Sequence, residues 1–132
     1  MNEVIRQKID SLPIQPGVYL MKDVKQQVIY VGKAKSLNKR IPQYFLKVHE
    51  GKTQKMVNSV SDFDIIITNT EKEALILEFN LIKKYYPKFN ISLKDTNSYP
   101  YITITNDKDP HLSIERVNKK SKNKKYYGPY PN

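Results

Sequence analysis

A single glutamate stands out among the apolar side chains of one predicted helix. Glu78 lies in the middle of a stripe of residues that recur at helical spacing, which are Ala74, Leu75, Glu78, Leu81, Ile82 and Tyr85. A carboxylate on an apolar helix face is costly unless it is paired, hydrogen-bonded or bound to a metal ion. Glu78 is therefore a candidate metal ligand, and a position at the rim or in a structural salt bridge is the alternative.

Tyrosine is the second residue type that could do chemistry. The chain has 10 tyrosines, no tryptophan and only 4 phenylalanines. Tyr19 and Tyr30 lie in two neighbouring predicted strands, and Tyr44 lies on the helix that follows. A phenol can stack on a base or move a proton, but it can also be an ordinary half-buried residue of a sheet.

Basic residues follow the second of these strands. They are Lys33, Lys35, Lys39 and Arg40, and Arg40 lies one helical turn before Tyr44, so the two share a helix face. Basic groups near a helix N-terminus suit a phosphate, and a solvated basic face is the alternative. The formal net charge of +10 also favours a polyanionic partner such as nucleic acid.

The composition excludes several other classes of site. There is no cysteine for thiol chemistry, and the two histidines, His49 and His111, are too separated for a zinc site and are expected at the surface. No phosphate-loop or dinucleotide-binding fingerprint is present. No apolar run approaches the ~20 residues of a membrane span, and the N-terminus has no apolar signal core. We therefore expect a cytoplasmic protein with no membrane partner.

Periodicity and helix breakers predict the elements that must position these residues. The predicted helices cover residues 3–11, 36–46 and 71–86, with Ser36 as one N-cap and Thr70 with Glu73 as a capping box. The predicted strands cover residues 17–21, 28–31, 63–68, 99–105 and 112–117. We expect loops over 48–54 and 118–125 and a short helix around Met56. Gly32 is expected to end the second strand, and Gly17 and Gly32 to permit close approach of the backbone.

Ordered motifs run through nearly the whole chain. The tripeptides Gly17–Tyr19 and Tyr30–Gly32 are followed by the segments EALILE, LIKKYYPKFNISLKD, SYPYI and YYGPYP. In this order, and with LPIQPGVYLMKD and IYVGKAKSL around the tripeptides, the sequence from residue 12 to 131 resembles the N-terminal GIY-YIG nuclease domain of bacterial UvrC-type excision-repair proteins.

The resemblance implies an α+β fold, with a small antiparallel three-stranded sheet flanked by helices and a C-terminal extension of strands and loops. It implies one domain over residues 1–132 that is part of a longer protein. The implied function is a DNA endonuclease that uses one divalent metal ion, Mg²⁺ or Mn²⁺. It would make the 3′-side incision near a lesion in nucleotide excision repair. The implied partners are DNA containing a lesion and UvrB, contacted through regions outside this chain and loaded with UvrA.

The resemblance also assigns roles to residues of this chain. The implied catalytic set is Tyr19, Tyr30, Lys33, Arg40, Tyr44 and Glu78. Glu78 is the implied metal ligand, and the implied substrate-binding residues are Lys33, Lys35 and Arg40. Gly17, Gly32 and Asn90 are implied as structural residues near the site. Tyr19 is the candidate general base, helped by Lys33 and metal-bound water. The division of labour among Tyr19, Tyr30 and Lys33 stays open.

The sequence departs from the family pattern at a few positions. Thr96 and Asn97 replace an acidic and a basic residue of the family, and Pro42 is unusual between Arg40 and Tyr44, where it could tilt the helix.

Two other functions remain as alternatives. A non-catalytic nucleic-acid-binding module would not need Glu78 together with Tyr19 and Arg40. A GIY-YIG nuclease of another branch would not be expected to carry the LPxxPGVY and YPYI segments.

Overall fold

The computed structural model describes residues 1–92 and 99–130 of the chain. The chain forms two compact units, Met1–Phe89 and Asn90–Asn132. The two departures from the family pattern at Thr96 and Asn97 lie outside the described residues.

The first unit is built on a three-stranded antiparallel sheet. Its strands are β1 (Gly17–Lys22), β2 (Val28–Ala34) and β3 (Asp62–Ile67), in the order β2-β1-β3. The carboxylate of Asp23 accepts hydrogen bonds from two backbone amides of the turn between β1 and β2. The predicted three-stranded sheet is confirmed, but β2 continues past Gly32 to Ala34.

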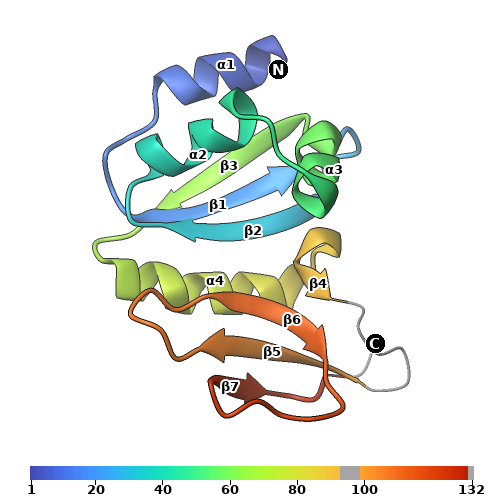
Figure 1. The fold of residues 1–132 in the computed structure, drawn as a ribbon. Helices are drawn as coiled ribbons and strands as arrows, with labels where there is room; N and C mark the ends of the chain where they lie inside the picture. Colours follow the sequence, from blue (N-terminus) through green and yellow to red (C-terminus); the bar gives the residue numbers. More distant parts are fainter. Residues whose placement is uncertain (93–98, 131–132) are drawn as a thin grey trace. The chain divides into compact units, whose positions relative to one another are not determined.

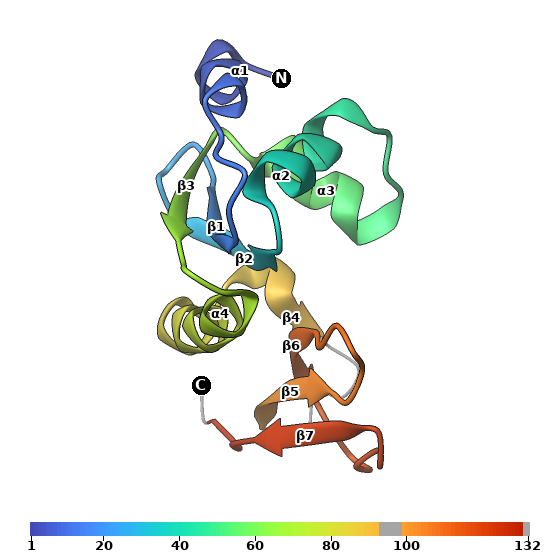
Figure 2. The same cartoon turned by 90° about the vertical axis from the view of Figure 1, so that its left-hand side faces the viewer.

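Four helices cover the two faces of this sheet. Figures 1 and 2 show α1 (Glu3–Asp10), α2 (Leu37–Leu46) and α3 (Gly51–Ser59) on one side and α4 (Glu71–Tyr85) on the other. The predicted capping box is present in a modified form. Thr70 accepts from the amide of Glu73, while the Glu73 carboxylate accepts from the amide of Asn69. Ser36 is the N-cap of α2, but its side chain makes no capping hydrogen bond.

The predicted loop over 48–54 is too long, because α3 begins at Gly51, and the predicted short helix around Met56 is confirmed. The only buried residue of α3 is Met56, so this helix has almost no apolar periodicity for a sequence pattern to detect. Pro42 lies inside α2, and the helix nevertheless continues to Leu46 with Ile41 and Tyr44 buried.

The core of the first unit lies between the sheet and α1 to α3. Its largest buried side chains include Ile5, Tyr19, Met21, Leu37, Ile41, Met56 and Phe63. On the other face α4 packs against β1 and β2 and buries Ala74, Glu78 and Ile82. The predicted apolar stripe of α4 is therefore largely confirmed, although Tyr85 at its end is 42% exposed.

Two glycines of the sheet occupy places where a side chain has no room. Gly32 pairs with Tyr19 across β1 and β2, and a Cβ on Gly32 would collide with Cζ and the hydroxyl of the Tyr19 phenol. A Cβ on Gly17 would meet the carbonyl oxygen of Ile66 and lie 2.8 Å from Cδ1 of Leu37. The expected close approach at both glycines is confirmed.

The second unit is a four-stranded sheet. It contains β4 (Ile91–Ser92), β5 (Pro100–Thr105), β6 (Leu112–Arg116) and β7 (Lys124–Tyr127), in the order β4-β6-β5-β7. The strand β4 is parallel to β6, and the other pairs are antiparallel. A 3₁₀ turn, Lys88–Asn90, precedes β4.

The predicted strands near 99–105 and 112–117 are confirmed, but the predicted loop over 118–125 is too long, because β7 begins at Lys124. The Nζ atom of Lys124 lies 2.9 and 3.0 Å from the two carboxylate oxygens of Glu115, so one lysine of the basic run is tied to the sheet. No helix in the described part of the chain is long and apolar enough to cross a membrane.

The close contact at Gly32 leads to a stability prediction. Gly32→Ala should lower the free energy of unfolding by about 1–3 kcal/mol, because the added methyl group overpacks the space that the Tyr19 ring fills. Urea denaturation measures this change. Gly51→Ala measures a different cost for comparison, because it strains the backbone at a positive φ without any steric collision. An unchanged free energy of unfolding in Gly32→Ala would contradict the packing argument.

Candidate active site

Three tyrosines from three elements meet on one face of the first sheet. Tyr19 of β1, Tyr30 of β2 and Tyr44 of α2 have ring centroids 5.6 to 6.3 Å apart. The hydroxyl oxygens of Tyr19 and Tyr44 are 2.7 Å apart and share a hydrogen bond. Tyr19 is only 1% exposed, so this is a buried polar contact and not a surface one.

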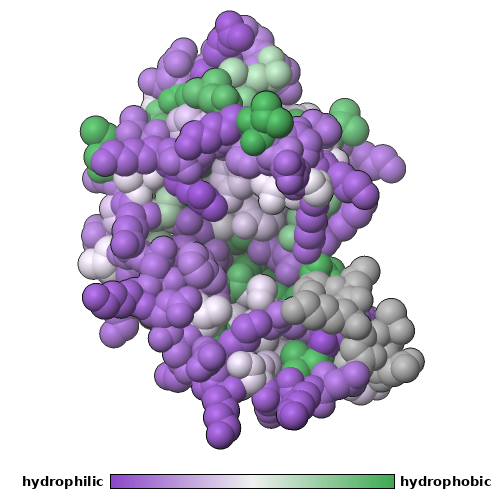
Figure 3. All heavy atoms as spheres, in the orientation of Figure 1, coloured by the Kyte–Doolittle hydropathy of each residue, from purple (hydrophilic) through white to green (hydrophobic). Residues whose placement is uncertain are grey.

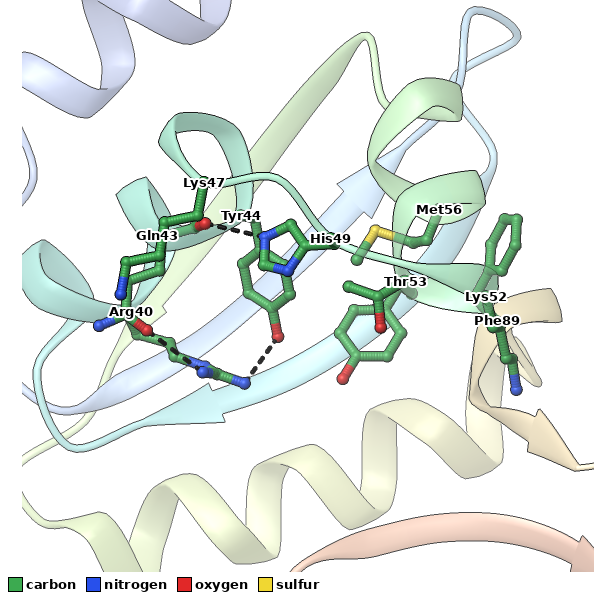
Figure 4. Close-up of a pocket in the computed structure, with 10 residues that line it drawn as sticks. Arg40, Gln43, Tyr44, Lys47, His49, Lys52, Thr53, Met56 and Phe89 are labelled. Carbon is green, nitrogen blue, oxygen red and sulfur yellow. Dashed lines mark hydrogen bonds between the residues drawn. The ribbon is translucent and has the colours of Figure 1, made fainter.

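Arg40 extends this hydrogen-bonded chain toward solvent. Its Nη2 atom donates to the Tyr44 hydroxyl at 3.1 Å, and its guanidinium carbon lies 4.9 Å from the centroid of the Tyr44 ring. Figure 4 shows the guanidinium beside the Tyr44 hydroxyl, with both side chains coming from α2. The predicted shared face of Arg40 and Tyr44 is confirmed.

Glu78 approaches the tyrosines from the opposite side of the sheet. It is 6% exposed on the face of α4 that packs against β1 and β2. Burial raises the pKa of Tyr30, and the charges of Tyr44 and Glu78 raise it further, so Glu78 lies within electrostatic range of that phenol. A position at the rim, one alternative for Glu78, is excluded by its burial.

The donor set near the tyrosines fits a metal ion that takes few protein ligands. Among residues 1–92 and 99–130, no three acidic, histidine or cysteine side chains form a group that could hold a metal. A single buried carboxylate suits Mg²⁺, because this ion keeps several water ligands and binds phosphate oxygens readily. Glu78 is the residue that would hold it.

Burial also sets the protonation of the phenols. The pKa of Tyr19 is raised well above its usual value, first by burial and then by the neighbouring Tyr30 and Tyr44. The charge of Arg40 acts in the opposite direction and lowers it. Tyr19 and Tyr30 are therefore neutral at pH 7, and Arg40 is a cation that favours ionisation of Tyr19.

Lys33 faces away from this hydrogen-bonded chain. It pairs with Val18 across β1 and β2, while its neighbour Gly32 pairs with Tyr19, so Lys33 and Tyr19 lie on opposite faces of the sheet. The Nζ atom of Lys33 donates to a carboxylate oxygen of Glu71 at 3.2 Å. Lys35 is mostly exposed, and its Nζ lies 3.9 Å from the other oxygen of Glu71. Glu71 thus holds both lysines at the start of α4.

The resemblance implied three structural residues near the site, two glycines of the first unit and one asparagine of the second. Gly17 and Gly32 give space at the sheet, and Gly32 lies directly against Tyr19. Asn90 is buried at the end of the 3₁₀ turn and belongs to the second unit. Its proximity to the tyrosines stays a prediction.

Sequence reasoning missed one side of the site. His49, expected at the surface, is partly buried, and its ring centroid lies 6.0 Å from that of Tyr44. It lines a pocket of about 480 Å³ that begins at Tyr30, Arg40 and Tyr44 and extends to α3. Nothing in the sequence indicates that His49 lies at this pocket, because the first residues of α3, which form part of the pocket wall, are predicted to be a loop.

Comparisons with known proteins find similar sequences and structures. A family model described as the UvrC-like GIY-YIG domain matches residues 15–91. The chain is 55% identical over 130 residues to the UvrABC system protein C of Desulfitobacterium hafniense. This match covers 98% of the chain but 21% of that protein, so the chain spans about a fifth of the relative's length.

Solved structures are similar over about two thirds of the chain. The GIY-YIG N-terminal endonuclease domain of UvrC from Thermotoga maritima, bound to its catalytic magnesium, is 44% identical with a TM-score of 0.62. That match covers 67% of this chain and 98% of the domain. A point mutant of the same domain, bound to the catalytic divalent cation, is 42% identical with a TM-score of 0.64 and is covered completely, over 70% of this chain.

The raised phenol pKa values predict alkaline destabilisation. The unfolded chain releases its phenol protons above pH ~10, while the buried Tyr19 and the partly buried Tyr30 keep theirs, so the unfolding free energy falls as pH rises. The expected slope is about 1.4 kcal/mol per pH unit for each buried phenol. Urea denaturation between pH 8 and about 11 measures it.

Tyr19→Phe should remove one such contribution and flatten the slope. The exposed Tyr99 provides the matched control, and Tyr99→Phe should leave the slope as it is. Identical slopes for the unchanged chain and Tyr19→Phe would argue against a buried, neutral Tyr19.

Proposed function

This chain belongs to the family of UvrC-like GIY-YIG domains, and we propose that it is a divalent-metal-dependent endonuclease that hydrolyses phosphodiester bonds of DNA. The observation that carries the proposal is the hydrogen-bonded series Arg40, Tyr44 and Tyr19, beside Tyr30, whose phenol lies within electrostatic range of the buried carboxylate Glu78. This arrangement combines a cation, a series of hydroxyl groups and one carboxylate, which are the groups that phosphoryl hydrolysis needs.

Glu78 is the proposed ligand of the divalent cation, Mg²⁺ or Mn²⁺. When bound, the cation polarises the scissile phosphate and stabilises the leaving 3′ oxygen. Glu78 contributes a fixed negative charge on a rigid helix, and its burial keeps water from competing for it. The related domain from Thermotoga maritima binds magnesium as its catalytic cation, which supports this role.

Arg40 is the proposed phosphate-binding residue. Its guanidinium is held by the Tyr44 hydroxyl and by its contact with the Tyr44 ring, so it is positioned before substrate arrives. A fixed cation stabilises the charge that develops on the phosphate oxygens, because it needs no reorganisation during the reaction. Lys33 and Lys35 are proposed to add substrate-binding charge at the start of α4, where Glu71 orients them.

Tyr19 is the proposed general base, and Tyr44 is the group that prepares it. Tyr44 accepts a hydrogen bond from Arg40 and can donate its own proton to the Tyr19 oxygen, 2.7 Å away. The charge of Arg40, which the Tyr44 hydroxyl holds close to Tyr19, lowers the pKa of Tyr19 and so opposes the effect of burial. Tyr30 lies on the same face and is proposed to orient water and phosphate.

The wider biological role is proposed from the relatives. Their membership of the UvrABC system supports a 3′-side incision near a lesion in nucleotide excision repair. In that role the substrate is DNA containing a lesion, and UvrB, loaded with UvrA, is contacted through regions outside this chain. Action on chromosomal DNA supports a cytoplasmic location.

Replacing Glu78 tests the metal site. Glu78→Gln should abolish metal-supported incision and lower Mn²⁺ binding to the 132-residue chain, because the amide has no charge to hold the cation. Calorimetry measures Mn²⁺ binding, and incision is measured on a lesion-containing duplex with the longer protein and its loading partners. The chain should stay folded by circular dichroism.

Glu50→Gln is the control for this change, because Glu50 is an exposed acid at the start of α3. Normal incision by Glu78→Gln at ordinary metal concentrations would exclude Glu78 as the ligand. Loss of activity in both variants would point to overall charge instead.

Replacing Tyr19 and Arg40 separates proton transfer from charge stabilisation. Tyr19→Phe should reduce the incision rate by about 10²–10⁴-fold with DNA affinity unchanged, since only a positioned base is lost. Arg40→Ala should also block incision but weaken DNA binding as well, because a phosphate contact disappears. Single-turnover incision and equilibrium binding are measured on the same duplex. A near-normal rate for Tyr19→Phe would remove Tyr19 as the base.

A further inference from the structure

The pocket beside the tyrosines has a lining that the proposed reaction does not use. It lies between α2, the connection that follows and the first half of α3 (Figure 4), and its volume is about 480 Å³. Its lining residues are Tyr30, Arg40, Gln43, Tyr44, Lys47, His49, Lys52, Thr53, Met56 and Phe89. The reaction proposed above involves only Tyr30, Arg40 and Tyr44.

The charge of the lining favours an anion. Arg40, Lys47 and Lys52 contribute three cationic groups, and no carboxylate is among the described residues that line the pocket. Desolvation lowers the pKa of Lys52, although the residue as a whole is exposed. Hydrophilic side chains also cover most of the face in Figure 3, in line with the net charge of +10.

The inner part of the lining is apolar and aromatic. Met56 is buried, and Phe89 and the Tyr30 ring are partly buried at the same pocket. Thioether and aromatic groups pack against a flat ring, and a nucleic-acid base has two such faces. The pocket thus pairs a surface for a base with a surface for a phosphate.

The outer wall of the pocket is braced. Nε2 of His49 lies 2.9 Å from the carbonyl oxygen of Gln43, and the amide of His49 donates to the side-chain oxygen of Gln54 at 3.0 Å. A carbonyl oxygen only accepts, so Nε2 carries the hydrogen. These two bonds fix the connection between α2 and α3, which means that the pocket is formed before a ligand enters.

We propose that this pocket holds one unpaired nucleotide of the DNA strand next to the scissile phosphate. The phosphate of that nucleotide contacts Lys47 and Lys52, and its base packs against Met56 and Phe89. The shared lining at Arg40 and Tyr44 makes it the neighbour of the reacting phosphate. This inference rests on the proposed function, because it takes the substrate to be DNA.

The phosphate contact is tested with two lysines of α3. Fluorescence anisotropy measures binding of a labelled single-stranded tetranucleotide to the 132-residue chain, in EDTA and at constant low salt. Lys52→Ala should raise the Kd about fivefold, as expected when one ion pair is lost. Lys55→Ala removes the same charge from an exposed position that does not line the pocket, and should change the Kd less than about twofold. Equal effects of the two variants would overturn the proposal.

The base contact is tested by filling the pocket. Thr53→Trp places an indole in the space for the base and should raise the Kd of the tetranucleotide about tenfold, the effect of losing one stacked base. Lys55→Trp is the matched control. A tetranucleotide with abasic sites should bind the unchanged chain more weakly, and Thr53→Trp should not weaken its binding further. Equal affinity for the normal and abasic strands would overturn the proposal.

A mononucleotide that binds as tightly as the tetranucleotide would indicate a site for a free nucleotide, and this result would overturn the proposal. The proposal would also be overturned if the unchanged chain showed no saturable binding of the tetranucleotide. Failure here is distinguishable from failure of the proposed function, since binding is measured without metal. Incision is measured separately, with metal present, on the longer protein with its loading partners.

Discussion

The arrangement of the site depends on the contact between the Tyr19 phenol and the backbone of Gly32. The ring can lie across β2 only because its cross-strand partner has no Cβ. That position brings the Tyr19 hydroxyl to within 2.7 Å of the Tyr44 hydroxyl, and Tyr44 in turn holds Arg40. A larger residue at Gly32 would push the phenol away and separate these groups, so one absent methyl group underlies the whole hydrogen-bonded series.

Burial gives this series its chemical character. Low exposure makes the phenols hard to ionise, whereas the guanidinium of Arg40 favours the ionised form of Tyr19. The two effects act on the same oxygen from opposite directions, and the balance between them sets how readily a proton leaves. Glu78 adds a negative charge from the other face of the sheet and raises the pKa of Tyr30. Identical phenols thereby acquire different surroundings within one cluster.

The sequence predicts the residues that lie on strongly patterned elements. Glu78 is found from helical periodicity alone, because α4 is long and buries Ala74, Glu78 and Ile82 along one stripe. The tyrosines follow from two strands whose order and glycines resemble a known family. The start of α3 could not be predicted, because this helix buries only Met56. The face of the sheet on which Lys33 lies could not be predicted either, because it depends on the register of the strands. His49 joins the pocket only through contacts distant from any apolar pattern.

The hairpin of β1 and β2 and the helix α2 follow one another directly in the chain and carry all the site tyrosines and Arg40. Their contacts are local, so they can form early in folding, whereas Glu78 arrives only when α4 docks after β3. During folding, the tyrosines and Arg40 therefore come together before the carboxylate of Glu78 joins them. A nascent chain would acquire its tyrosine cluster before its affinity for a divalent ion, and that affinity would report completion of the first unit.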